Sequence, residues 1–530
     1  MDSRKKTDGL TRRDFLRSLA AGISVPSLTK LPGFRSSAVL NDLFWVKRIP
    51  DHPFYDPGQL NFHIGLDSLF YLMADNGLKF YRSSGGHPFA GPSGLIAAGD
   101  VVLLKVNAQW KYRGCTNSDL IRGLIQRILD HPDGFYGEVV IIENGQGRGS
   151  LRCDTTAAYG GDPSVHANAN NEAHHFLYLV NKVFNDPRVS TYLLDPIRGT
   201  FIGDNDHVRN GYRKFENVSY PCFTTAGGNR VELREGIWKA GAHHGNLKLI
   251  NVPVLKHHDT GGSEITASLK HMYGLVSMSD GQSGLRHYSG LGETCGKMMV
   301  SVATPVLNII DAIWVSYSTL GGYPASTTFR ANQLLASQDP VAADYWAAKY
   351  ILHPVDSNSR HHPDFAGIDR WLVQARDTIN GSGGLRNPEK GILVGRVTRK
   401  EAEMRAQTCN AGDFLNNVRL SVSRSGLHFI ASSLEARTLE KPLGIAVSGA
   451  SPLTWRIQTD APWLSCMPTT GSGNKTVAVL ARTAGLEPGK HTGRVVIHCP
   501  GVANSPQSVP VVLSLLERQR RADRDSRSKF

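Results

Sequence analysis

The sequence predicts an α/β fold, a mostly parallel sheet with helices on both faces, followed by a small C-terminal all-β sandwich domain. Two patterns carry this prediction. Continuous apolar strands alternate with helical segments over residues 40–400, and short alternating segments separated by turn residues fill 418–516. A chain of 530 residues is also too long for one ordinary hydrophobic core, so we expect more than one domain.

The first strand, helix and strand read as one βαβ unit. Residues 99–109, GDVVLLKVNAQ, are a run of β-branched residues and leucines typical of a strand buried on both faces. Residues 119–130, DLIRGLIQRILD, repeat apolar side chains at helical spacing after the capping residues Asn117 and Ser118. Residues 137–149, GEVVIIENGQGRG, predict the next buried strand. This order favours parallel strands joined by a helix that covers one face of the sheet.

The same alternation returns in the second half of this region. We expect strands at 246–255, 307–317 and 332–338 and helices at 263–275 and 339–352. Asp339 and Pro340 match a cap and first turn. The helix at 263–275 would turn one apolar stripe to the core, made of Ile265, Leu269, Met272, Tyr273 and Val276. The apolar stretch 298–317 is interrupted by polar residues, so we expect a buried helix and strand rather than a membrane span.

The formal net charge of +13 is concentrated at the two ends of the chain. Residues 1–35 carry eight Lys and Arg against three Asp, and the tail 517–530 carries six against three acids. The body has no basic stripe, so we do not expect a nucleic-acid partner; the tail is typical of a solvated, disordered segment.

The N-terminal segment resembles a twin-arginine export signal. TRRDFLR at 11–17 precedes a short apolar run at 18–28 that is too short to span a bilayer. We therefore expect a signal or anchor at 1–35 and a periplasmic or secreted protein, exported after folding. That route is often used by proteins that acquire a cofactor inside the cell.

The C-terminal segment at 418–516 resembles the BACON-type bacterial sandwich modules. The resemblance lies in W-x-x-x-T-D-A-P-W-L-S, the following Gly-Ser-Gly turn and L-x-P-G-x-x-x-G. Such modules are often attached to extracellular carbohydrate-active proteins. Trp455 and Trp463 could stack on a glycan, although tryptophans in such strands more often belong to the core. Cys466 and Cys499 could pair in an exported protein.

Titratable side chains gather where the strand at 246–255 ends. Lys256 and His258 follow this strand, and Lys270 lies on the expected helix after the Gly261-Gly262 pair. Ligands bind at the carboxyl ends of strands in open parallel sheets, and helix amides favour an anion. We expect Lys256, His258 and Lys270 to be the catalytic residues, with histidine carrying the proton and the lysines holding negative charge. The plain alternative is a solvated polar loop.

The order of these motifs resembles the bacterial and archaeal family called domain of unknown function 362, over about residues 95–355. The shared pieces are K-x-H, then L-K-x-x-x-G-L, the early strand GDVVLLKVN, the D-A-I-W segment and A-S-Q-D-P-V-A-A-D. By matching position the resemblance implies an α/β domain at 40–400 whose ligand-binding residues are Lys105, Asn107, Asp311, Asp339 and Asp344. Three have plain alternatives: a helix cap for Asp339, a helix-face carboxylate for Asp344 and a structural hydrogen bond for Asn107.

The sequence departs from the family at His271, where members commonly carry asparagine, and it lacks their ferredoxin-like cysteine segment. Seven cysteines without any C-x-x-C pair argue against an iron–sulfur cluster made by this chain. A metal or an organic cofactor stays open. Imidazoles with Asp259 could hold a metal, although no fixed ligand spacing supports it; these histidines are His243, His244, His257, His271 and His287.

Two functions follow from these observations. The first is an exported enzyme or redox-associated protein whose α/β cleft binds an anionic small molecule or cofactor. The second is a non-catalytic envelope protein that binds glycan or a partner through its C-terminal sandwich. Exposed Trp455 and Trp463 would favour the second function, and buried ones would weaken it.

Overall fold

The computed structural model describes residues 40–54, 61–84, 87–145, 149–155, 162–194, 211–215, 218–258, 264–277, 288–386, 393–432, 436–448, 453–499, 502 and 504–516. The expected export signal at 1–35 and the basic tail at 517–530 lie outside these residues.

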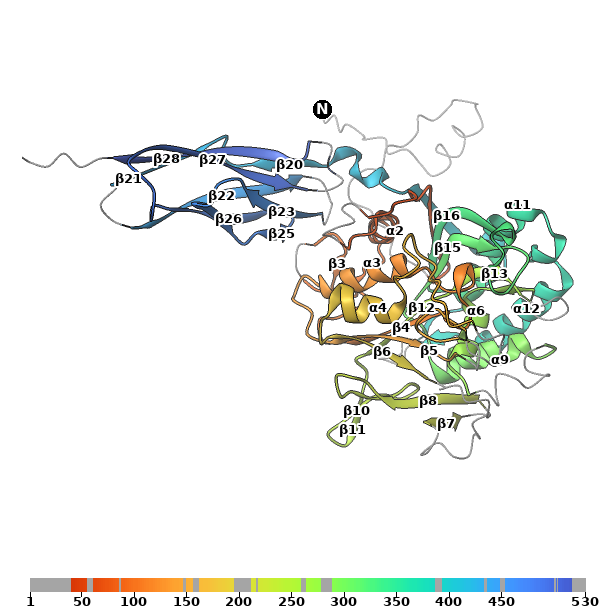
Figure 1. Cartoon of the computed structure of the whole chain (residues 1–530). Coiled ribbons are helices and arrows are strands. Elements are labelled where there is room, and N and C mark those ends of the chain that lie inside the picture. Colours follow the sequence, from red (N-terminus) through yellow and green to blue (C-terminus); the bar gives the residue numbers. More distant parts are fainter. Residues whose placement is uncertain are drawn as a thin grey trace, which may run out of the picture. The chain divides into compact units, whose positions relative to one another are not determined.

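A ten-stranded mixed sheet forms the centre of the first 410 residues (Figure 1). Its main path runs β19-β1-β16-β15-β12-β4-β5-β6, with β13 paired to β15 and β14 to β13. The neighbours β15, β12, β4, β5 and β6 are all parallel, while β16 is antiparallel to both β1 and β15. The strands are β1 (Asp42–Lys47), β4 (Val101–Val106), β5 (Glu138–Glu143), β6 (Val189–Leu193), β12 (Leu247–Val252), β13 (Val254–His257), β14 (Ile265–Thr266), β15 (Leu307–Ser316), β16 (Thr328–Ser337) and β19 (Arg405–Asn410).

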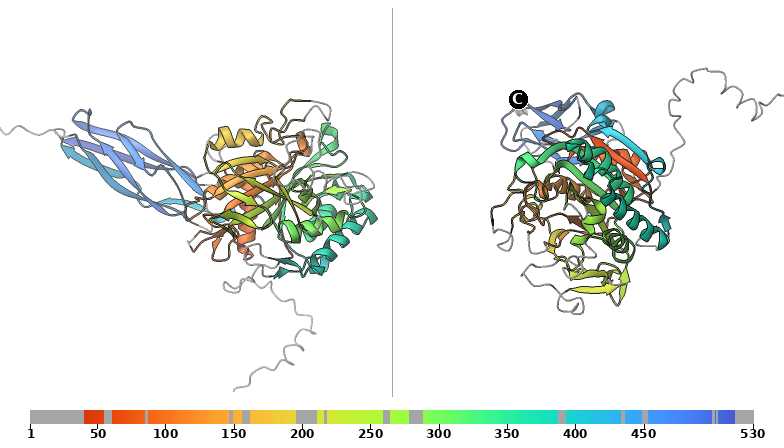
Figure 2. Two further views of the ribbon diagram at one scale, coloured as in Figure 1. Left: turned by 90° about the horizontal axis from the view of Figure 1, so that it is seen from below. Right: turned by 90° about the vertical axis from the view of Figure 1, so that its right-hand side faces the viewer.

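Helices cover both faces of this sheet, so the α/β prediction is confirmed. Alternate residues of β4 enter two different cores, Leu103 on one face and Leu104 on the other. Helices α2 (Ile64–Asp75) and α3 (Ser118–Leu129) pack on the face of Leu104; α9 (Leu291–Lys297), α10 (Pro340–Ala347) and α12 (Ala366–Gly381) pack on the other. Two further views show the helices around the sheet (Figure 2). The shorter helices are α4 (Phe176–Tyr178), α6 (Ser268–His271) and α11 (His353–Asp356).

Several helix ends follow the sequence closely. The Asn117 side chain accepts from Leu120 N and caps α3. Asp339 accepts from the amides of Val341 and Ala342 and caps α10, with Pro340 in the first turn. The apolar stretch at 298–317 is a helical segment, η5 (Met298–Val302), followed by strand β15. No described helix has the length and apolar character needed to cross a bilayer.

The helix expected at 263–275 is wrong over its first half. Ile265 and Thr266 form β14, which pairs with His257 and Lys256 of β13 as an antiparallel hairpin. Helix α6 then spans one turn and continues as the 3₁₀ segment η4 (Met272–Gly274). The stripe residues are buried as expected. Their helical spacing was misleading because β-branched Ile265 and Thr266 gain more from pairing with a neighbouring strand.

The remaining residues form smaller sheets. A five-stranded sheet follows the order β11-β10-β9-β8-β7, and β2 pairs with β3 and β17 with β18. Beyond residue 418 two sheets, β20-β22-β26-β24 and β21-β28-β27-β23-β25, share one hydrophobic core that contains Trp455 and Trp463. The strands are β2 (Tyr81–Arg82), β3 (Ala90–Gly91), β7 (Tyr212–Phe215), β8 (Val218–Thr224), β9 (Arg230–Glu232), β10 (Gly236–Lys239), β11 (Ala242–His244), β17 (Leu385–Arg386), β18 (Leu393–Gly395), β20 (Arg419–Val422), β21 (Leu427–Ser432), β22 (Thr438–Ser448), β23 (Thr454–Thr459), β24 (Leu464–Met467), β25 (Thr470–Ser472), β26 (Lys475–Arg482), β27 (Gly489–His498) and β28 (Gln507–Leu516).

We expect the Asp67→Asn substitution to lower the free energy of unfolding by about 3 kcal/mol, because it leaves a buried guanidinium without its counter-charge. Asp67 on α2 accepts two hydrogen bonds of 2.6 Å from Arg127 on α3, and both side chains are buried. Urea denaturation measures the loss. Asp460→Asn, which breaks the exposed pair with Arg494, is the control and should cost under about 1 kcal/mol. Equal losses would contradict the prediction.

Candidate functional site

The carboxyl ends of three neighbouring strands bring charged side chains together. Lys105 is the last but one residue of β4, where it pairs in register with Ile142 of β5 and Asn251 of β12. Glu143 is the last residue of β5, and Lys256 belongs to β13, which continues beyond β12 after Pro253. All of these side chains are buried. The strand order therefore places two lysines and a carboxylate at the edge of the sheet where ligands bind in open α/β folds.

Lys105 is fully engaged by its neighbours. Its ammonium forms an ion pair with Glu143 and donates to the Val106 carbonyl at 2.8 Å and to His271 Nε2 at 2.9 Å. An ammonium has three N–H donors, and these three partners use all of them. Because His271 Nε2 accepts, its Nδ1–H must donate to Asn251 Oδ1, at 2.6 Å. Lys105 therefore holds a hydrogen-bonded network together across β4, β5, β12 and α6.

Burial decides the charge states within this network. It raises the pKa of Glu143 to about 6, against the opposite effect of Lys105. Burial, with the positive charge of Lys105 as a second cause, holds the pKa of His271 well below its usual value, so this imidazole is neutral near pH 7. A neutral histidine is the form that can accept from one neighbour and donate to another.

Gly274 explains the glycine of the L-K-x-x-x-G-L motif. A Cβ built at this position would stand 2.6 Å from Glu143 Oε2 and closer still to Lys105 Nζ. The backbone of Gly274 also accepts a hydrogen bond from Asn144 N at 3.1 Å, which fixes the segment against the end of β5. The glycine therefore lets η4 approach the ion pair without a side chain between them.

Lys256 is less engaged than Lys105. Among the described residues its ammonium makes one hydrogen bond, to the Gly114 carbonyl at 2.7 Å. Burial lowers the pKa of Lys256 to about 7; the positive charges of Lys270 and Lys105 act in the same direction, while Cys115 and Glu143 oppose them. Lys256 is thus a buried amine that exchanges its proton near neutral pH.

The structure brings Lys270 close to Lys256 but leaves His258 at the rim. Lys270 is buried on α6, with its Nζ 5.0 Å from the centroid of the Tyr273 ring, and its charge acts on Lys256. The half-buried His258 follows β13, where its backbone amide donates to the Glu264 carbonyl at 2.8 Å. We refer to Lys105, Lys256 and Lys270 as the lysine cluster. A catalytic role for His258 stays a prediction.

The four other expected ligand-binding residues hold backbone amides. Asn107 Oδ1 accepts from Val254 N, and Asp311 accepts from the amides of Asn117 and Ile313. Asp344 accepts from Ser268 N and Leu269 N at the start of α6. Asp339, besides capping α10, accepts from Asn41 and from Thr398 N. These contacts favour positioning roles, and ligand binding by the four stays a prediction.

Burial raises the pKa of these carboxylates as well. It brings the pKa of Asp311 and of Asp344 to about 7 and that of Asp339 to about 6, while the donated amide hydrogen bonds pull each value down. The three groups therefore fix the loops and helix starts around the lysine cluster with charges that burial makes costly.

Two side-chain contacts at this edge were not predicted from the sequence. Cys115 and Cys153 lie with their sulfur atoms 3.8 Å apart, and Cys115 acts on the charge of Lys256. On β13, His257 Nδ1 lies 2.9 Å from His361 Nε2, and His361 Nδ1 lies 3.2 Å from Asp356. Residues far apart in sequence form both contacts, so local patterns carry no signal for them.

The side chains expected to hold a metal are partly among the described residues. Within the described ranges no group of three or more His, Cys, Asp or Glu side chains has a geometry that would hold a metal ion. Asp259 and His287 lie outside the described residues. His243 contacts Glu232 and His271 contacts Lys105, so these two described histidines lie in different surroundings. The described cysteines, Cys466 and Cys499 among them, are free thiols.

Residues 236–349 match the family model described as Domain of unknown function (DUF362), which supports the family resemblance over the segment that carries Lys256 and Lys270. A comparison with curated proteins gives no match.

Similar solved structures include three with low overlap. A Bacteroides ovatus GH5 xyloglucanase in complex with a XXXG heptasaccharide is 20% identical, covering 18% of this chain and 19% of its own, with a TM-score of 0.16. The PapD-like domain 7 of human CEP192 is 14% identical, covering 19% and 87%, with a TM-score of 0.16. The Pseudomonas aeruginosa CupB2 chaperone is 12% identical, covering 18% and 55%, with a TM-score of 0.15. This chain spans about a fifth of the xyloglucanase, and these likenesses carry no functional argument.

We expect Gly274→Ala to destabilise the protein by about 1–3 kcal/mol, because the added methyl group has to displace the Lys105 and Glu143 pair. Urea denaturation measures the change in the free energy of unfolding. Gly381→Ala is the matched control: it lies in α12 with no atom within 4 Å of its added Cβ, and it should be neutral or slightly stabilising. A neutral Gly274→Ala would contradict the packing argument.

Proposed function

We propose that the α/β domain binds an anionic small molecule or organic cofactor at the lysine cluster and that Lys256 transfers a proton there, in an exported enzyme or redox-associated protein. The observation that carries this proposal is a lysine buried at the carboxyl ends of the strands with one described hydrogen bond, whose pKa burial lowers to about 7. General acids and bases work best when their pKa lies near the operating pH, and perturbed groups of this kind gather at active sites.

The division of labour within the cluster follows from the contacts. Lys105 has no donor left for a ligand, so its positive charge acts by lowering the pKa of Lys256. The single described hydrogen bond leaves two of the three Lys256 donors for an anion. We therefore assign the proton transfer to Lys256 first, with His258 and Lys270 as further candidates that a ligand would have to reach.

The reaction of the bound molecule is set by its own chemistry, and an organic or metal cofactor would supply that chemistry. The lysine cluster would hold its negative charge, and Lys256 Nζ would exchange one proton with it. Lys256 would be neutral after it loses its proton and charged again when an anion binds beside it. Ligand binding and the protonation of Lys256 would therefore be coupled.

We further propose that residues 418–516 form a BACON-type sandwich and that the N-terminal signal sends the protein to the periplasm or outside the cell. The shared core of the two C-terminal sheets supports the sandwich. Trp455 and Trp463 belong to that core, with exposed fractions of 1% and 8%. Glycan stacking on these tryptophans would need the core to open, which weakens the non-catalytic glycan-binding alternative.

The proposal predicts that an anionic aldehyde labels Lys256 selectively. Pyridoxal 5′-phosphate at pH 7, trapped with borohydride, should form a secondary amine at Lys256, because about half of this amine is unprotonated against roughly one in a few thousand for an ordinary lysine. Peptide mass spectrometry measures the label at each lysine. Lys256→Arg should lose it, and pyridoxal without the phosphate should label Lys256 less.

Labelling spread evenly over surface lysines, with no enrichment at Lys256, would overturn the proposal. Equal labelling by pyridoxal and its phosphate would remove the anion from the proposal and leave only a reactive amine.

The pKa of Lys256 also predicts a pH dependence of stability. The folded-state pKa of about 7 lies below the unfolded value of 10.5, so the unfolded chain binds the extra proton between these values. The loss of stability caused by burying the charged Lys256 is complete below pH 7 and disappears as the pH rises to 10.5. Relative to Lys256→Met, the wild type should gain about 1.4 kcal/mol per pH unit in this window. Urea denaturation at pH 7 and pH 9 measures the difference, with the exposed Lys490→Met as a control that should give none.

A further inference from the structure

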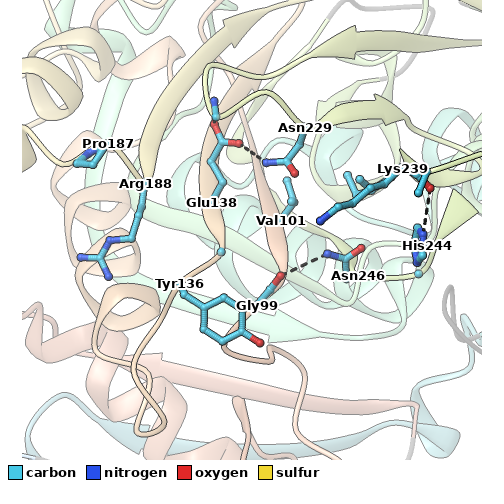
Figure 3. Close-up of a pocket in the computed structure, with 15 residues that line it drawn as sticks. Gly99, Val101, Tyr136, Glu138, Pro187, Arg188, Asn229, Lys239, His244 and Asn246 are labelled. Atoms are coloured by element: carbon cyan, nitrogen blue, oxygen red, sulfur yellow. Dashed lines mark hydrogen bonds between the residues drawn. The ribbon is translucent and has the colours of Figure 1, made fainter.

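A cavity of about 740 Å³ lies at the opposite end of the parallel strands from the lysine cluster (Figure 3). Its lining includes residues at the starts of four strands: Gly99 lies two residues before β4, and Gly137, Asn246 and Arg188 directly precede β5, β12 and β6. Along β4 alone, the wall residue Val101 and Lys105 are four residues apart, or about 13 Å. The cavity is therefore a separate site, and its size falls within the usual range for small-molecule pockets.

The β10–β11 hairpin forms one wall of the cavity. Ile237 and Lys239 alternate along β10 and share one face of the strand, and His244 of β11 pairs with Ile237. Figure 3 shows Lys239 and His244 side by side on this wall. The other face of the hairpin carries Trp238, packed against His243. The register of the hairpin therefore places the Lys239 ammonium and the His244 imidazole at the cavity wall.

The charged side chains that line the cavity are Glu138, Arg188 and Lys239. The carboxylate of Glu138 is satisfied by Ser190, Thr225, Asn229 and the Gly227 amide. Arg188 is occupied by Asp186 and the Phe135 carbonyl.

The ammonium of Lys239 differs from the charged groups of Glu138 and Arg188, since Lys239 is exposed and its Nζ has no ion-pair or hydrogen-bond partner among the described residues. An anion is the group that would complete it.

Asn246 offers the cavity a hydrogen-bond acceptor that lacks a donor. Its Nδ2 donates to the Gly99 carbonyl at 3.3 Å, as Figure 3 shows, which leaves Oδ1 on the other side of the amide. Asn246 Oδ1 is buried and has no hydrogen-bond partner in the described part of the chain. A buried acceptor without a partner costs about 1–3 kcal/mol, so a ligand hydroxyl that donates to it would be favoured.

Tyr136 supplies an apolar platform beside these polar groups. Its ring is 78% exposed, yet its backbone is held by a hydrogen bond of 2.9 Å from Tyr136 N to the Ala98 carbonyl. A Cβ on Gly99 would stand 2.6 Å from Tyr136 Cε2, so the ring packs directly on the glycine backbone. A large exposed aromatic ring offers a stacking surface for a flat apolar face.

From these features we infer that the cavity binds an acidic saccharide of one or two rings. Its carboxylate pairs with Lys239, one hydroxyl donates to Asn246 Oδ1, and the apolar face of one ring stacks on Tyr136. A simple inorganic anion would use only Lys239, and a neutral sugar would use only Asn246 and Tyr136. This inference is independent of the function proposed for the lysine cluster.

Isothermal titration of the full chain with digalacturonate, an acidic disaccharide, tests this site. We expect saturable binding that falls at least tenfold in Lys239→Glu and in Tyr136→Ala. Lys182→Glu, an equal charge change at an exposed position away from the cavity, should bind like the wild type, and so should Lys256→Ala. Unchanged urea midpoints would show that the cavity variants remain folded.

Three results would overturn the inference: no binding of digalacturonate, equal binding by Lys239→Glu and the wild type, or equally tight binding of inorganic phosphate. Binding of the neutral disaccharide maltose as tight as that of digalacturonate would remove the acidic group from the assignment. If Lys239→Glu and Lys182→Glu lose affinity equally, the attraction comes from the overall charge of the protein, which also contradicts a specific site.

Discussion

The buried ion pair between Lys105 and Glu143 is the interaction on which the rest of the candidate site depends. It joins two adjacent parallel strands at their carboxyl ends, and both partners are almost completely removed from water. Removing one member of such a pair leaves an uncompensated buried charge at a cost of about 3–5 kcal/mol. The third donor of Lys105 fixes the His271 ring, which in turn fixes Asn251. One ion pair thus determines the positions of side chains on four elements.

The properties of Lys256 follow from this arrangement. A lysine beside a free carboxylate would keep its charge, but Glu143 is already paired with Lys105. Burial then dominates, and the positive charges of Lys105 and Lys270 act in the same direction on the pKa of Lys256. The arrangement of Lys105 and the lowered pKa of Lys256 are therefore linked through Glu143. Exchanging their roles would require Glu143 to turn toward Lys256.

The elements that could be predicted from the sequence are those whose patterns lie within one short segment. The buried strands around Val101 and Val139, the caps at Asn117 and Asp339 and the family motif at Lys256 and Lys270 could all be read from short segments. The prediction of a helix over 263–275 was wrong over its first half. Its apolar spacing suits a helix and a buried hairpin alike, and only the pairing with β13 decides between them.

Which site residues bind a ligand and which hold the chain could not be read from the sequence, because this depends on partners far away along it. Lys105 and Lys256 look equivalent in the motif, yet one has three partners and the other has one among the described residues. Asp311 and Asp344 carry the charge expected of ligands, but backbone amides occupy their oxygens. Cys115 and Cys153, which meet at 3.8 Å, lie 38 residues apart.

The two ends of the central sheet show how burial sets the use of a lysine. At the carboxyl end, Lys256 is closed off from water, so its charge is costly and its proton exchanges near neutral pH. At the amino end, Lys239 is exposed, so its ammonium stays hydrated as a point charge. The same residue type therefore suits proton transfer at one end and charge recognition at the other. The difference lies in the loops: those at the carboxyl end bury the lysine, whereas the β10–β11 hairpin holds Lys239 at the wall of an open cavity.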